Sequence, residues 1–192
     1  MAQAGPGKIR IFEDFFNTYD TSDVADNSTT PDTVSVGPFS VFGEGLIEID
    51  AGLLHLNALS GAVRMSTTNV GDDGTFVGTT NAFDVALMAP IVIEARVQFN
   101  NLDTKRAFIG LTDAEGGSGK KDLSVEDDVV AAVTTTFTPV ASDYVGFYLS
   151  SELDDDEDWH ILFRGGSASQ STDTQESDLS DDAVAGEWQV LR

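Results

Sequence analysis

The acidic segment from Glu152 to Glu157 comes closest to a catalytic pattern. Its sequence, ELDDDE, places carboxylates at Glu152, Asp154 and Glu157. Two carboxyl groups about 5–5.5 Å apart can hydrolyse a glycosidic bond with retention, one as the nucleophile and one as the general acid. Acids in such a site alternate along a strand with apolar residues, but here Asp155 and Asp156 stand between them. Because burying unpaired carboxylates is very unfavourable, we predict a solvated hairpin turn and no enzymatic activity.

The same acidic run offers oxygen ligands to a hard cation such as calcium, which binds several carboxylate and carbonyl oxygens. The best candidate ligands are Asp154, Asp156 and Asp158. A second turn, VGDDGT, offers Asp72 and Asp73. Neither segment has the regular ligand spacing of a known calcium loop. Calcium is therefore the one cofactor that the sequence leaves open, and we expect no other.

Aromatic side chains are a third group of candidates. Tyr144, Tyr148, Trp159 and Trp188 lie in or beside strand-like segments, and aromatic rings on a strand can stack on sugar rings. The first three are the main candidates. The alternative is that they pack in a β-sandwich core, where such rings usually lie. The two histidines, His55 and His160, also lie in strand-like segments and have no cysteine partner. We expect these histidines on strand faces and not in a metal site.

The composition limits the classes of function. The chain has 192 residues, no cysteine, and 33 acidic against 10 basic residues, for a formal net charge of -23. A surface this acidic has no basic patch with which to bind nucleic acid or anionic lipid, so we expect neither partner. Without cysteine there is no disulfide and no thiolate metal site, and no apolar run approaches the roughly 20 residues that span a membrane. The acidity either keeps copies of the protein from associating until a specific partner binds, or serves solubility alone.

Short alternating segments separated by Gly-containing turns predict antiparallel β-strands. The clearest is IVIEARVQF, in which every second residue from Ile91 is apolar and shares one face. We predict an all-β fold, an antiparallel β-sandwich of the jelly-roll type with long polar loops, over residues 39–192. For residues 1–38 we predict an extended N-terminal arm, a first strand and a long polar loop that leaves the sandwich. The segments expected to form strands of the sandwich include 39–42, 46–50, 53–58, 62–66, 91–99, 106–113, 129–137, 143–150 and 159–166.

The order of these segments resembles a known fold family. EARVQF, KRAFIGLTD, SDYVGFYL, WHILFRGG and AGEWQVLR follow one another as in the concanavalin A-like lectin/glucanase jelly roll, the laminin-G-like group included. The resemblance covers roughly residues 40–192 and implies a lectin-like sandwich. Laminarinase-type glycoside hydrolases of this fold have the Glu-x-Asp-x-x-Glu spacing seen from Glu152. The family has a final hairpin after the strand that GEWQVLR resembles, so we expect that the natural chain continues, or that strand swapping or a neighbouring subunit completes the sheet.

The opening segment KIRIFEDFF, residues 8–16, resembles virion structural proteins of tailed phages, which use this fold in capsid decoration or fibre modules. The resemblance implies a non-enzymatic decoration or cement protein on the outer surface of the capsid. Its partners would be the major capsid protein, neighbouring virion subunits and further copies of itself. The alternative is a carbohydrate-binding, lectin-like module of a phage fibre or surface protein. The residues expected to contact partners are Ile9, Ile11, Phe12, Phe15, Trp188 and Leu191.

Overall fold

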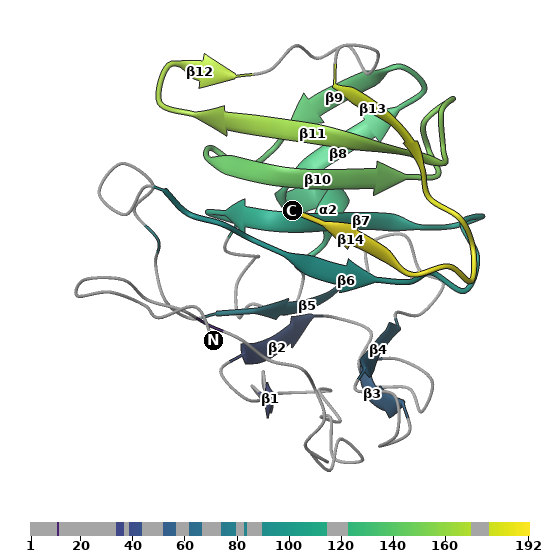
Figure 1. Cartoon of the computed structure of the whole chain (residues 1–192). Coiled ribbons are helices and arrows are strands. Elements are labelled where there is room, and N and C mark those ends of the chain that lie inside the picture. Colours follow the sequence, from purple (N-terminus) through teal and green to yellow (C-terminus); the bar gives the residue numbers. More distant parts are fainter. Residues whose placement is uncertain are drawn as a thin grey trace. The chain divides into compact units, whose positions relative to one another are not determined.

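The fold is known from a computed structural model, and the regular secondary structure of its described residues is β-strand except for one four-residue helix (Figure 1). Their sheets are antiparallel, which confirms the predicted all-β fold class. The chain divides into two compact units, residues 1–90 with 116–124 and residues 91–115 with 125–192. The predicted strand 46–50 and the residues before the predicted boundary at 38/39 lie largely outside the described part. The structure describes residues 11, 34–36, 39–43, 52–56, 62–66, 74–79, 83, 90–114, 123–169 and 177–192.

The first unit contains a three-stranded antiparallel sheet and a separate hairpin. The sheet has the strand order β1-β2-β5, and β3 pairs with β4 in the hairpin. The strands predicted at 39–42, 53–58 and 62–66 are confirmed, each to within two residues at its ends. The bounds are β1 Val34–Val36, β2 Phe39–Gly43, β3 Gly52–Leu56, β4 Ala62–Ser66 and β5 Thr75–Gly78.

The second unit is built on a sheet with the order β12-β11-β10-β7, in which β13 also pairs with β11. Gly146 on β10 lies opposite Gly110 on β7. A Cβ atom on Gly146 would lie 2.9 Å from the Gly110 Cα atom, so glycine is required for this close approach. The strands predicted at 106–113, 143–150 and 159–166 are confirmed. The bounds are β7 Arg106–Thr112, β10 Tyr144–Ser150, β11 Asp158–Gly165, β12 Ala168–Ser169 and β13 Asp178–Asp182.

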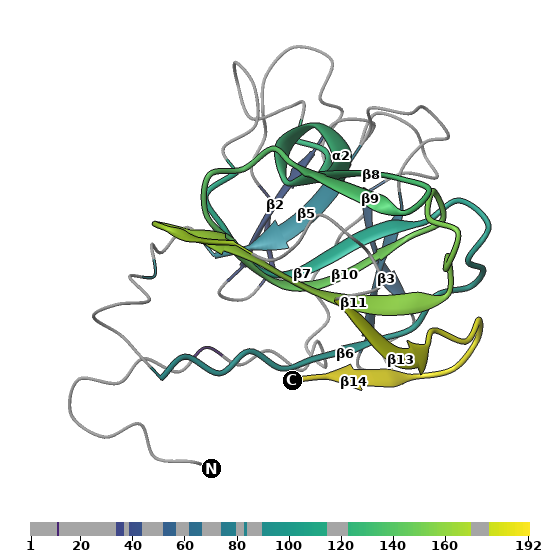
Figure 2. The same ribbon diagram turned by 90° about the horizontal axis from the view of Figure 1, so that it is seen from above.

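Smaller elements lie on the two faces of this sheet (Figure 2). On one face, β6 (Ala95–Val97) and β14 (Gln189–Leu191) form a two-stranded antiparallel ribbon. The other face is covered by the hairpin of β8 (Val130–Val133) and β9 (Thr136–Pro139), with the short helix α2 (Val125–Asp128) beside it. The sheet is therefore packed on both sides within this unit.

Two cores result from this layering. On the ribbon side, the buried residues Leu149, Trp159, Ala183 and Leu191 pack together. On the hairpin side, the Phe137 ring packs edge-on against Tyr148 and His160, at centroid distances of 5.6 Å and 5.2 Å.

The segment 129–137 differs from its prediction as one strand. It turns at Thr134, which has a φ of 58°, and so forms most of the β8–β9 hairpin. The left-handed backbone is unfavourable for a β-branched residue. Two hydrogen bonds hold it: the Thr134 N–H donates to the Glu152 carbonyl and the Asp154 N–H donates to the Thr134 carbonyl, both at 2.9 Å. A distant turn, and not a local glycine, therefore fixes the bend.

Candidate functional site

The acidic turn between β10 and β11 is exposed, which confirms the predicted solvated turn. Glu152 and all four acidic residues from Asp154 to Glu157 lie at the surface, whereas Leu153 between them is buried. Arg106 Nη2 lies 3.2 Å from Glu152 Oε1. Glu152, the first acid of the Glu-x-Asp-x-x-Glu spacing, is therefore engaged in a surface ion pair. The backbone of the turn is anchored to the β8–β9 hairpin by hydrogen bonds.

The proposed calcium ligands do not converge. No group of three or more histidine, cysteine or acidic side chains among the described residues is placed to hold a metal ion. Asp154 and Asp156 are exposed, whereas Asp158 lies opposite Asp182 in the pairing of β11 with β13. Asp158, at the start of β11, is thus separated from Asp154 and Asp156, which lie in the turn before this strand. Asp72 and Asp73 lie outside the described residues.

Asp158 instead belongs to a carboxylate pair across two strands. Its pKa is raised from 3.8 to about 6, chiefly because partial burial costs the charged form hydration and also through a hydrogen bond with Asp182. The negative charges of Asp178, Asp182 and Asp155 act in the same direction. A proton on Asp158 therefore relieves the repulsion from its acidic neighbours and supplies the hydrogen bond to Asp182.

Three of the four aromatic residues predicted to stack on sugars are buried, and the fourth, Trp188, is exposed. Tyr144, Tyr148 and Trp159 are 3%, 0% and 1% exposed, so none offers a ring face to a ligand. Trp159 packs against Phe99 and its Nε1 donates to Gln189 Oε1 at 3.1 Å. Burial also raises the pKa of Tyr148 to about 12. The structure contradicts the stacking role for these three rings and supports the alternative of core packing.

The described histidine side chain is also part of the core. His160 on β11 is buried, with Nδ1 3.3 Å from Ser177 Oγ and its ring against Phe137. His55 lies on β3, opposite Val63 of β4. Both histidines are thus on strands, as predicted.

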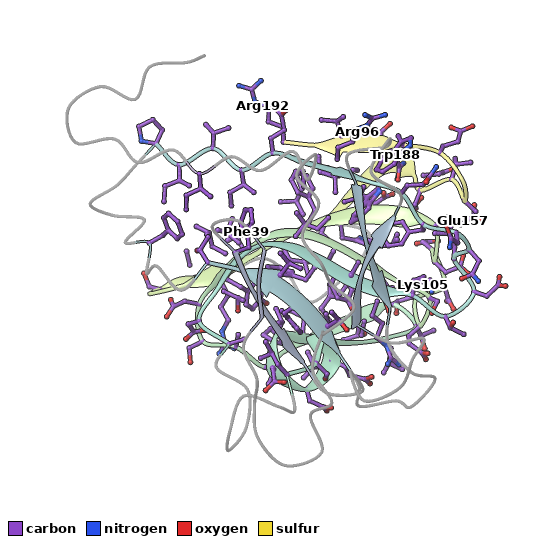
Figure 3. All side chains as sticks on the ribbon, turned by 90° about the horizontal axis from the view of Figure 1, so that it is seen from below. Phe39, Arg96, Lys105, Glu157, Trp188 and Arg192 are labelled. Atoms are coloured by element: carbon purple, nitrogen blue, oxygen red, sulfur yellow. The ribbon has the colours of Figure 1, made fainter. Side chains whose placement is uncertain are left out.

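The outward side of the β6–β14 ribbon carries an exposed row of apolar and charged side chains. We call it the ribbon face. Residues from Ile91 to Asn100 alternate between half-buried and exposed, which confirms the predicted alternation of this segment. Val190 lies opposite Arg96, and the Arg96 guanidinium lies 4.6 Å from the centre of the Trp188 ring (Figure 3). Arg192 Nε lies 3.8 Å from Glu94 Oε2. The ribbon face consists of Val92, Glu94, Arg96, Trp188, Val190 and Arg192.

The residues predicted to contact partners differ in their exposure. Trp188 is exposed on the ribbon face, as its prediction requires. Leu191 is only 8% exposed and packs in the ribbon-side core, so its prediction as a contact residue is wrong. Ile11 is half-buried. Ile9, Phe12 and Phe15 lie outside the described residues, and their role stays a prediction.

Sequence reasoning missed Val92, Val190 and Arg96 as members of this face. The signal was present, because a period of two places Trp188 with Val190 and away from Leu191. The same period places Val92 with Arg96 on the outward side of 91–99. Alternation alone does not say which side of a ribbon another layer covers, so the exposed side had to come from the structure.

Comparison with known proteins adds no relative to this description: no family model, no curated protein and no solved structure matches the chain. The helix α2 has four residues. No helix among the described residues is long and apolar enough to cross a membrane.

Proposed function

We propose that the protein is a non-enzymatic virion component, a decoration or cement protein that binds the outer surface of a capsid through the ribbon face. The observation that supports this proposal is the row of exposed apolar side chains there. Val92, Val190 and Trp188 are 66%, 62% and 44% exposed, although apolar side chains of this size usually lie in a core. Tryptophan and arginine are the residues most often found at the energetic centre of a protein interface.

The charge of the ribbon face also favours a protein partner. The face carries two arginines and one glutamate, whereas the whole chain has a formal net charge of -23. An approaching protein is therefore not repelled at this face as it is by acidic surfaces elsewhere. The resemblance of the opening segment to virion proteins supports a capsid as the partner.

Cosedimentation with capsid shells of the virus that encodes the chain tests the proposal. The double substitution Trp188→Ala and Val190→Asp is expected to weaken binding about tenfold or more, because it removes the exposed apolar centre. Val133→Asp is the matched control, since Val133 is equally exposed but lies on the β8–β9 hairpin. Equal binding by all three proteins, or no binding by the wild-type chain, would overturn the proposal.

A sugar ligand is the second candidate, and the exposed Trp188 is the observation that favours it. Aromatic rings stack on the apolar faces of sugar rings, and the adjacent Arg96 could donate hydrogen bonds to hydroxyl or carboxylate groups. A glycan array probed with the wild-type chain and with Trp188→Ala separates the candidates. Wild-type binding that is lost in the variant favours a lectin-like module, and an array without signal removes it.

A further inference from the structure

The ribbon face concentrates cations in a chain that is poor in them. The chain has ten basic residues against 33 acidic ones. Of the basic side chains that the structure describes, Arg106 is held between carboxylates of α2 and the acidic turn, and Arg164 donates to the Ala141 carbonyl at 2.8 Å. Arg96 and Arg192 are instead exposed together on the ribbon face (Figure 3). Both cations therefore meet whatever approaches this face.

The positive charge of the face is centred on Arg96. Glu94 offsets the other cation, since Arg192 Nε lies 3.8 Å from Glu94 Oε2. The Arg96 guanidinium lies over the Trp188 ring, 4.6 Å from the ring centre. A cation over an aromatic ring is held through its charge, whereas a carboxylate is bound by the N–H donors of the guanidinium in a bidentate pair. Trp188 therefore positions a group that is suited to bind a carboxylate.

The strand that carries Trp188 is anchored on its inward side. Leu191 packs in the ribbon-side core. The Gln189 side chain accepts from Trp159 Nε1 at 3.1 Å and donates from Nε2 to the Asp182 carbonyl at 2.8 Å. A surface whose backbone is fixed before binding loses less conformational entropy when a partner arrives. The outward side chains of β14 are therefore presented on a base that is already ordered.

We propose that the ribbon face recognises an acidic segment of its partner protein, in which a carboxylate binds Arg96 in a bidentate pair and an adjacent apolar side chain packs on Val190. Val190 lies opposite Arg96 in the ribbon, so neighbouring acidic and apolar residues of the partner reach both. An acidic segment is repelled by the rest of a chain with a net charge of -23 and is attracted here. Arg96 is thus the residue that sets specificity. This recognition rests on the proposed function of the ribbon face and names the chemistry of its partner.

Cosedimentation of Arg96 variants with capsid shells tests the recognition. Arg96→Lys keeps the positive charge but cannot form the bidentate pair, so we expect its affinity to fall about tenfold. Lys105→Gln is the control, since it removes a positive charge away from the ribbon face (Figure 3) and should bind as the wild-type chain does. Circular dichroism and thermal unfolding check that each variant folds. If folded Arg96→Lys binds the shells as tightly as the wild-type chain, this inference is wrong while the proposed function stands.

A peptide array tests the chemistry of the partner without the capsid. Its peptides place an aspartate or glutamate beside a large apolar residue, and each has a copy with the corresponding amide in place of the acid. We expect the wild-type chain to bind the acidic peptides about tenfold more tightly than the amide copies, and Arg96→Lys to lose this preference.

The outcomes of the two measurements separate the two proposals. Binding of acidic peptides without binding of shells supports this recognition and overturns the capsid as partner. Equal binding of acidic and amide peptides overturns the recognition, whether or not the shells bind. No binding of either peptides or shells overturns both proposals. Binding of acidic glycans in place of acidic peptides also overturns the recognition, because the occupant would then be a sugar.

Discussion

Replacing Asp158 with asparagine is expected to stabilise the protein at neutral pH and to flatten its stability profile in mildly acidic solution. In the unfolded chain Asp158 titrates near 3.8, and in the folded chain its pKa is raised to about 6. Between these values the folded state binds more protons, so stability falls as pH rises. The contribution of the protonated pair is fully present below about pH 3.8 and is lost as pH rises through about 6. An asparagine amide at this position would keep a donor toward Asp182 at every pH.

The magnitude follows from the difference between the two pKa values. About two pKa units correspond to at most about 3 kcal/mol. Because the Asp158 side chain is only partly buried, screening by water reduces this to about 1–2 kcal/mol. Urea unfolding of wild-type and Asp158→Asn chains at about pH 7 and about pH 4 measures the difference between their free energies of unfolding. We expect the substitution to stabilise the protein more at the higher pH.

Asp156→Asn is the matched control, since it removes the same charge from an exposed position in the turn just before β11. Its free energy of unfolding should change by less than about 0.5 kcal/mol. The reasoning is refuted if Asp158→Asn destabilises the protein near neutral pH, or if both variants gain equally.

Two further predictions concern packing. Gly146→Ala should lower the free energy of unfolding by about 1–3 kcal/mol, because its methyl group would lie 2.9 Å from the Gly110 Cα atom; Gly78→Ala, with open space at its Cβ, is the control, and equal losses in both would contradict the close approach. Trp159→Phe should cost about 1 kcal/mol or more in urea unfolding, because it removes the donor to Gln189. An unchanged free energy of unfolding in Trp159→Phe would contradict this role for the indole hydrogen bond.

The strands were predictable because alternation and turn residues are local properties. The segment 91–99 shows its alternation in the half-buried and exposed side chains of the structure. β7, β10 and β11 begin and end within one residue of their predicted bounds. The turn at Thr134 was not predictable, because it contains no glycine, asparagine or proline and is held by the distant residues Glu152 and Asp154.

The roles of the aromatic residues were not predictable, because β10 is apolar on both sides. Tyr144 and Tyr148 alternate with Val145, Phe147 and Leu149, and either set could have faced a core. In the structure the tyrosines pack toward the β8–β9 side, and Leu149 and Phe147 pack toward the ribbon. The sequence could not show that one sheet is packed on two sides, since that depends on contacts between distant segments.

On the proposal that the ribbon face binds a partner, the negative charge of the chain directs association as well as maintaining solubility. The chain has a formal net charge of -23, whereas the ribbon face carries two arginines and one glutamate. Screening in physiological salt has a length of about 8 Å, so a partner on this face interacts mainly with the charges closest to it. An acidic partner is repelled by the acidic surface elsewhere and is left with the ribbon face for binding, which is a condition for specific assembly.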